Sequence, residues 1–274
     1  MKSKSLFPLL SLTLTAALLA PLPTRVAAAT EAEAAAGRAL VKRYADTIVS
    51  IEMVVVVKTG GERGSQSREV KRETNGTMIA ANGLTVTSLS LIDPRAAAGG
   101  RAADGPETEF KEVKLRLADN SEVAAQVVLK DSDLDLAFIA PESEAAAAGH
   151  TFAFVKLEDA AEPTVLSNYY EITRMPKTLQ RTPIVQMSTV VGMIERPRRF
   201  VLVTEQTPGC PVFDPQGKVL GISVYYSSGG RQVANMILPA TDVADMAKQA
   251  MLAKPDNPGK AAANETAPAE QPKT

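Results

Sequence analysis

Residues 75–92 read NGTMIAANGLTVTSLSLI, and this stretch decides the fold. Two short aliphatic and β-branched segments, residues 77–80 and 84–89, lie on either side of Asn82-Gly83. Asn-Gly is favoured in the two-residue turns of β-hairpins, because both residues tolerate positive φ angles there. The stretch therefore predicts two antiparallel strands joined by a tight turn.

Short segments of similar character recur along the rest of the chain, separated by turns rich in Gly, Pro, Asn and Asp. They are residues 48–57, 113–117, 122–129, 134–139, 151–155, 164–167, 184–194, 200–204, 211–213, 218–225 and 232–237. Many short strands at even spacing predict an all-β protein, built as paired antiparallel barrels or as a sandwich. We place the first barrel in residues 46–140, a linker in 141–150, and the second barrel with a final helix in 151–253.

Helices are expected only near the two ends of the strand-rich region. Residues 30–45 are rich in Ala and Glu and predict an amino-terminal helix. Thr241 is expected to cap a second helix, whose apolar residues recur at helical spacing. Residues 59–67 and 95–106 predict loops, and the Pro/Ala/Lys/Glu-rich residues 254–274 predict a disordered tail.

The first 29 residues have the pattern of an export signal. Lys2 and Lys4 precede an apolar run at residues 6–22, and Ala27-Ala28-Ala29 offers a cleavage site. The alternative is an uncleaved membrane anchor, but the run is short and contains prolines. We therefore expect an exported protein, periplasmic or secreted, with no membrane span after cleavage.

Composition excludes several kinds of function. Cleavage after residue 29 leaves 27 basic and 31 acidic side chains, and a mild negative charge argues against nucleic acid as the main partner. Cys210 is the only cysteine, so no internal disulfide is possible. His150 is the only histidine, which excludes a His-rich metal site. We expect no cofactor.

Further motifs lie in a fixed order around the hairpin. They are ADTIVSI at residues 45–51, DSDLDLAF at 131–138, QTPGCPV at 206–212, GKVLGI at 217–222 and NMILP at 235–239. Together with the hairpin they resemble the protease domain of the high-temperature-requirement (HtrA) branch of trypsin-like serine proteases, over residues 38–252. This resemblance implies a trypsin-like double antiparallel β-barrel with an active cleft between the barrels. The family's carboxy-terminal peptide-binding (PDZ) module is not expected here.

The resemblance also implies that the catalytic triad is degenerate. Asp135 matches the triad carboxylate, but Ser90 stands in place of the histidine and Pro208 in place of the nucleophilic serine. Serine protease chemistry needs a hydroxyl, a base beside it and a carboxylate that orients the base. Pro208 also lacks a backbone N–H that could stabilise an oxyanion.

The remaining residues of the corresponding cleft loop are Gln206, Thr207, Gly209 and Cys210, and Gln206 replaces a glycine of the family. Cys210 is therefore one candidate for a replacement nucleophile, with His150 as its base. The simpler interpretations are that Cys210 fills a small buried space and that His150 lies on a surface loop.

Three functions remain open from the sequence. The first is an exported, non-catalytic scaffold that binds a peptide or an unfolded protein segment in the cleft between the barrels. The second is an active endopeptidase with Cys210 as its nucleophile. The third is a structural or assembly protein of the cell envelope, and a homo-oligomer is compatible with any of them.

Overall fold

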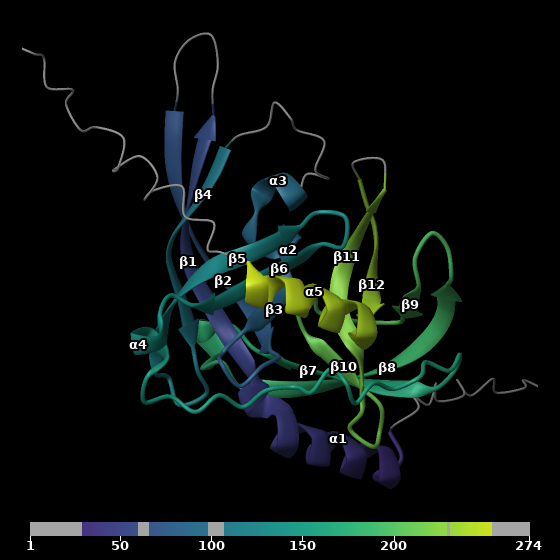
Figure 1. Ribbon diagram of the computed structural model, residues 1–274. Helices are drawn as coiled ribbons and strands as arrows, with labels where there is room; N and C mark the ends of the chain where they lie inside the picture. Colours follow the sequence, from purple (N-terminus) through teal and green to yellow (C-terminus); the bar gives the residue numbers. More distant parts are fainter. Residues whose placement is uncertain (1–28, 60–65, 98–106, 229–230, 254–274) are drawn as a thin grey trace, which may run out of the picture.

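Two closed antiparallel β-barrels lie side by side in the computed structural model, which describes residues 29–59, 66–97, 107–228 and 231–253 (Figure 1). The strands of the first barrel are β1 (Ile48–Thr59), β2 (Gln66–Met78), β3 (Thr85–Ser88), β4 (Glu107–Arg116), β5 (Glu122–Asp131) and β6 (Leu136–Pro141). Those of the second are β7 (Asn168–Arg174), β8 (Pro183–Ile194), β9 (Phe200–Val203), β10 (Pro211–Phe213), β11 (Val219–Ser228) and β12 (Arg231–Pro239). The orders around the barrels are β1-β2-β3-β6-β5-β4 and β10-β11-β12-β9-β8-β7. The predicted all-β double barrel is therefore confirmed.

Short helices flank the barrels. They are α1 (Glu31–Tyr44), α2 (Leu89–Ile92), α3 (Pro94–Ala97), α4 (Glu144–Ala147) and α5 (Ala240–Leu252), with 3-10 turns η1 (Ala45–Thr47) and η2 (Lys177–Leu179). Helix α1 packs on β7 and β8, whereas α5 packs on β11 and β12 and reaches β5 of the first barrel (Figure 1). None of the helices in the described ranges is long and apolar enough to cross a membrane.

The predicted hairpin is present, but its first strand is longer than expected. Thr77 pairs with Val86 and Met78 with Thr85, and Gly83 in the turn has a φ of 86°. Strand β2 begins at Gln66 and pairs with the whole of β1. The polar first half of β2 shows no apolar alternation, so its strand character comes from pairing with β1 and is not visible in the sequence. The predicted loop at residues 59–67 is therefore wrong at both ends, where residues belong to β1 and β2.

Two predicted strands of the second half are absent. Residues 151–155 form no ladder, although Val155 donates its backbone N–H to the Met78 carbonyl. Phe152 and Val155 are buried in different core clusters because this segment crosses between the barrels, whereas Ala153 is exposed. Residues 164–167 form a turn in which Leu166 has a φ of 67°, and the strand begins only at Asn168.

The two terminal helices start close to where the sequence indicates, but the expectation of no other helix is wrong, because the short helices α2, α3 and α4 lie between the strands. Thr30 caps α1 in a reciprocal capping box with Glu33. Helix α5 is capped by Pro239, the last residue of β12, so Thr241 lies inside the first turn and the predicted cap is wrong. The predicted signal up to residue 28, residues 98–106 of the predicted loop and the tail 254–274 lie outside the described residues.

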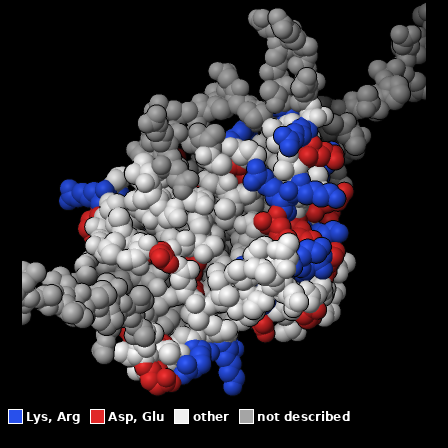
Figure 2. Space-filling model, turned by 180° about the vertical axis from the view of Figure 1, so that it is seen from behind, with Lys and Arg blue, Asp and Glu red and all other residues white. Residues whose placement is uncertain are grey.

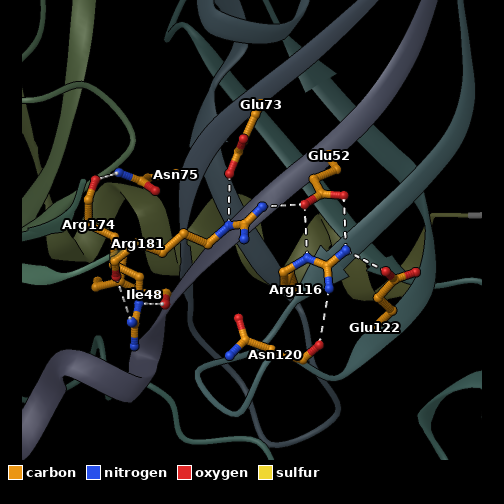
Figure 3. A network of polar contacts seen from close by, with 9 residues as sticks. All are labelled: Ile48, Glu52, Glu73, Asn75, Arg116, Asn120, Glu122, Arg174 and Arg181. Atoms are coloured by element: carbon orange, nitrogen blue, oxygen red, sulfur yellow. Dashed lines mark hydrogen bonds and ion pairs between the residues drawn. The ribbon is translucent and has the colours of Figure 1, made fainter. Parts of the chain in front are cut away.

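An ion-pair network ties the hairpin tip of the second barrel to the outside of the first (Figure 3). Arg181 donates from Nε to Glu73 at 2.8 Å and from Nη2 to Glu52 at 2.5 Å. Glu52 in turn accepts two hydrogen bonds from Arg116, which also pairs with Glu122. The Arg116 guanidinium lowers the pKa of Glu52. The β7–β8 hairpin is thus fixed against β1 and β2.

Arg181→Ala is expected to lower the free energy of unfolding by about 1–2 kcal/mol, because it removes two charged hydrogen bonds, of which the one to Glu52 is partly buried. Arg198→Ala is the matched control: its ion pair with Asp242 is more exposed, with 47% of the Arg198 side chain accessible against 12% for Arg181. Urea denaturation measures both. The ion pairs of Arg181 do not stabilise the fold if Arg181→Ala lowers the free energy of unfolding by no more than Arg198→Ala does.

Candidate functional site

Asp135 lies at the junction of the two barrels and accepts hydrogen bonds from both. It is 5% exposed and precedes β6 with a φ of 55°. From the first barrel it accepts the Ser90 N–H at 2.7 Å and the Ser88 hydroxyl; from the second it accepts the Tyr225 N–H at 2.8 Å. The structure therefore brings Ser90 and Asp135 together. Burial raises the pKa of Asp135, and the hydrogen bonds oppose that rise.

The loop of residues 204–210, called the Pro208 loop below, packs against the first barrel. Its Gly209 carbonyl accepts the Thr77 hydroxyl at 2.9 Å. Gly209 has a φ of 84°, and a Cβ at this position would lie 2.7 Å from the Thr87 oxygen and 3.3 Å from the Ser88 nitrogen. Only glycine fits that conformation and that contact. The loop is thus held next to the end of β3, two residues before Ser90, and Pro208 itself is buried.

Residues 207–210 of this loop already use their backbone donors within the protein. The Thr207 N–H donates to both carboxylate oxygens of Glu171, at 2.7 and 2.8 Å. Gly209 donates to the Ser223 carbonyl at 2.7 Å, and Cys210 donates to the Thr207 carbonyl at 3.2 Å. The proline between them has no N–H. None of these four positions presents an uncommitted amide to an oxyanion.

Glu171, in the middle of β7, is a fully buried carboxylate that the sequence interpretation missed. It contacts the Thr207 amide and lies 3.5 Å from the Ser223 hydroxyl. Burial raises its pKa to about 7, although the bonds from Thr207 and Ser223 favour the charged form. The signal in the sequence is a single glutamate inside the strand NYYEITR, whose neighbours are apolar or aromatic.

Cys210 is a buried thiol rather than an exposed nucleophile. It is completely inaccessible and donates to the Thr173 hydroxyl at 3.1 Å. Burial, together with the nearby Glu171 charge, raises its pKa, which disfavours the thiolate that a nucleophilic cysteine needs.

His150 lies in a different neighbourhood. Its Nδ1 is 3.5 Å from the Ser121 hydroxyl and its ring stacks on Phe152, both next to the first barrel. Among the contacts of the described residues, none joins His150 to Cys210. The geometry therefore gives no support to the pair as nucleophile and base. Among the residues that the structure describes, no cluster of His, Cys, Asp and Glu side chains could hold a metal ion.

A solvent-open cavity of about 550 Å³ lies on the second barrel, and residues 204–206 of the Pro208 loop form part of its lining. The lining residues are Gln186, Val191, Leu202, Val203, Thr204, Glu205, Gln206, Ala234 and Asn235. Its volume falls within the range of small-ligand pockets. Gln206 therefore lines a cavity on the second barrel, whereas the sequence predicts a cleft between the two barrels.

The comparison with protein families agrees with this architecture. The family described as the trypsin-like peptidase domain matches residues 74–222, more than half of the chain. No curated protein matches. Among solved structures, the apo protease domain of MamO from Magnetospirillum magneticum is similar, with 17% sequence identity and a TM-score of 0.44. The match covers 70% of this chain and 94% of that domain.

Proposed function

We propose that this chain, which belongs to the trypsin-like peptidase domain family, binds an extended peptide or unfolded protein segment without cleaving it. The proposal includes export, with residues 1–29 as the signal peptide. It assigns Asp135, Ser90 and Pro208 to the positions of the catalytic carboxylate, histidine and serine.

The observation that carries the proposal is the chemistry of the Pro208 loop. Pro208 has neither a nucleophilic side chain nor an N–H, and the amides of Thr207 and Gly209 are bound to Glu171 and Ser223. Acyl transfer depends on free donors aimed at the developing oxyanion. A loop whose donors are already paired keeps its shape but offers no free amide to a developing oxyanion.

The surroundings of Asp135 support a structural role for this carboxylate. Ser90 contacts it through its backbone N–H, and a serine hydroxyl does not act as a base near neutral pH in the way that imidazole does. The other partners of Asp135 are Ser88 and Tyr225, so the carboxylate joins the barrels instead of orienting a base.

The charge distribution suits a peptide better than a polyanion. Figure 2 shows acidic and basic side chains interleaved over the side of the first barrel, and few charges over the side of the second. A nucleic-acid site requires a continuous basic surface. The second barrel, which bears few charges on this face, is also the barrel that contains the cavity.

The test is an assay of the chain from Thr30 onward against a fluorescently labelled unfolded protein, with a fluorophosphonate and a thiol-directed probe in parallel. We expect product formation at the rate of the buffer control and no fluorophosphonate labelling. Ser90→Ala and Cys210→Ala should leave this background unchanged. Hydrolysis that either substitution abolishes would show a working catalytic site and overturn the proposal.

A further inference from the structure

We propose that a second cavity, between helix α1 and the segment that crosses between the barrels, binds a carboxylate joined by a short chain to an aromatic ring. We call it the crossover cavity. It shares no lining residue with the Pro208 loop or with the cavity on the second barrel. The inference therefore goes beyond the proposed function and does not depend on it.

The crossover cavity has a volume of about 380 Å³ and lies where three parts of the chain meet. Helix α1 contributes Arg43 and Tyr44, the crossing segment contributes residues 152–156 and Asp159, and the turn before β11 contributes Gly217. This volume is at the small end of the range for ligand pockets. It suits a single ring with a short polar chain better than a long stretch of peptide.

Aromatic side chains form much of the wall. Phe152 and Tyr44 are buried in two different core clusters, and the partly buried Phe154 packs on the cluster of Phe152. The Tyr44 ring is held in place, because its hydroxyl donates to the Gly217 carbonyl at 2.7 Å and its ring stacks on Phe213. Aromatic rings pack favourably on one another, offset or edge to face. The wall therefore favours a ligand with an aromatic body.

Two cations line the same cavity without an acidic partner. The Arg43 guanidinium carbon lies 4.8 Å from the centre of the Tyr44 ring, and Lys156 extends from the crossing segment. Among the described residues, no carboxylate forms an ion pair with either side chain. Their donors are thus available to an anion that enters the cavity.

Gly217 allows the Arg43 guanidinium to lie against the turn before β11. A Cβ at position 217 would lie 2.9 Å from Arg43 Nη1, and Gly217 has a φ of 87°. The guanidinium is therefore placed between this turn and the Tyr44 ring. Its planar fork matches the two oxygens of a carboxylate, which it can bind with two parallel hydrogen bonds.

Asp159 limits the charge that the ligand can carry. It lines the same cavity, and its charge reaches the same phenol as that of Arg43. Burial raises the pKa of Tyr44, Arg43 lowers it and Asp159 raises it. Two cations and one carboxylate leave a single positive charge in excess, which matches a monoanion. A phosphate dianion would be repelled by Asp159.

The experiment measures binding to the chain from Thr30 onward by isothermal titration calorimetry. The probes are phenylpropanoate, its neutral amide, and phenyl phosphate. Phenylpropanoate should bind about tenfold more tightly than the amide, because a charged hydrogen bond to Arg43 is lost in the amide. Two short peptides that end in Phe, one with a free carboxylate and one amidated, test whether the end of a chain can supply the same group.

Arg43→Gln should weaken the binding of phenylpropanoate about tenfold and remove the preference over the amide. Lys156→Gln should weaken it about threefold, because this cation is exposed. Lys42→Gln is the matched control: it removes the neighbouring exposed cation of α1, which does not line the cavity. It should leave the affinity unchanged.

Each outcome supports or overturns the inference. Binding of phenylpropanoate alone identifies a free acid as the ligand, and binding of the free-acid peptide as well identifies the end of a chain. The inference is wrong if neither acid binds, if acid and amide bind equally, or if phenyl phosphate binds more tightly. Lys156→Gln keeps the test decisive if Arg43→Gln does not fold, since an affinity equal to that of Lys42→Gln would place the binding elsewhere.

Discussion

Asp135→Ala is expected to lower the free energy of unfolding by about 3–5 kcal/mol, because it leaves several buried donors without their shared acceptor. Those donors are the Ser88 hydroxyl and the Ser90 and Tyr225 amides, which come from both barrels. A carboxylate whose only role is to orient a catalytic base would not cost this much. Urea denaturation followed by circular dichroism measures the loss.

Asp133→Ala provides the control two residues earlier in the same turn, where the side chain is exposed. Surface substitutions of this kind change stability by about 0.5 kcal/mol or less. Asp135→Asn should fall between the two, because it keeps the size and one acceptor oxygen. If Asp135→Ala lowers the free energy of unfolding by no more than Asp133→Ala does, the carboxylate does not hold the barrels together. A catalytic role for Asp135 would then have to be considered again.

The fold could be predicted largely from local signals. Asn82-Gly83 marks the position of the turn correctly, but the register is not that of a two-residue turn: Ile79 bonds to Leu84 across a longer loop in which Gly83, and not Asn82, has a positive φ. The first half of β2 is different, because residues such as Glu69 and Arg72 carry no apolar pattern and form a strand through their partners on β1. The segment around Phe152 shows the opposite error, since Phe152 and Val155 are buried by packing between the barrels without any ladder.

The candidate site likewise has one part that the sequence predicts and another part that depends on the folded chain. Asp135, Ser90 and the Pro208 loop follow from the order of motifs, and the structure places Ser90 on the Asp135 carboxylate. The bond from Thr207 to Glu171 joins residues 36 positions apart, and its existence depends on which face of β7 points inward. The sequence shows that Glu171 lies in an apolar strand, but only the folded chain shows that its carboxylate accepts a hydrogen bond from the Thr207 amide.

Glu171→Gln is expected to remove a pH dependence of stability that amounts to about 3 kcal/mol. The pKa of Glu171 is about 7 in the folded protein against an ordinary value of 4.5, because burial disfavours the charged carboxylate. The folded state therefore binds this proton more tightly than the unfolded chain does. The stabilisation from protonated Glu171 is complete below the unfolded pKa and is lost as the pH rises through the folded pKa.

The measurement compares urea unfolding of Glu171→Gln and of the unaltered chain between about pH 4.5 and about pH 8. Glutamine stays neutral over this range and keeps an oxygen that can accept the Thr207 N–H. The variant should therefore gain stability relative to the unaltered chain as the pH rises, with most of the gain complete slightly above the folded pKa. Taking the difference between the two chains cancels the titration of all other groups to first order.

Glu69→Gln makes the same chemical change on an exposed part of β2 and is the matched control. A flat difference for Glu171→Gln would mean that the pKa of Glu171 is the same in the folded and the unfolded chain, with the bonds from Thr207 offsetting the effect of burial. A difference of the opposite sign, with the variant losing stability as the pH rises, would mean that the charged carboxylate is the main anchor of the Pro208 loop. The expected sign instead describes a loop held by a buried carboxyl group whose ionisation costs stability as the pH rises toward about 7.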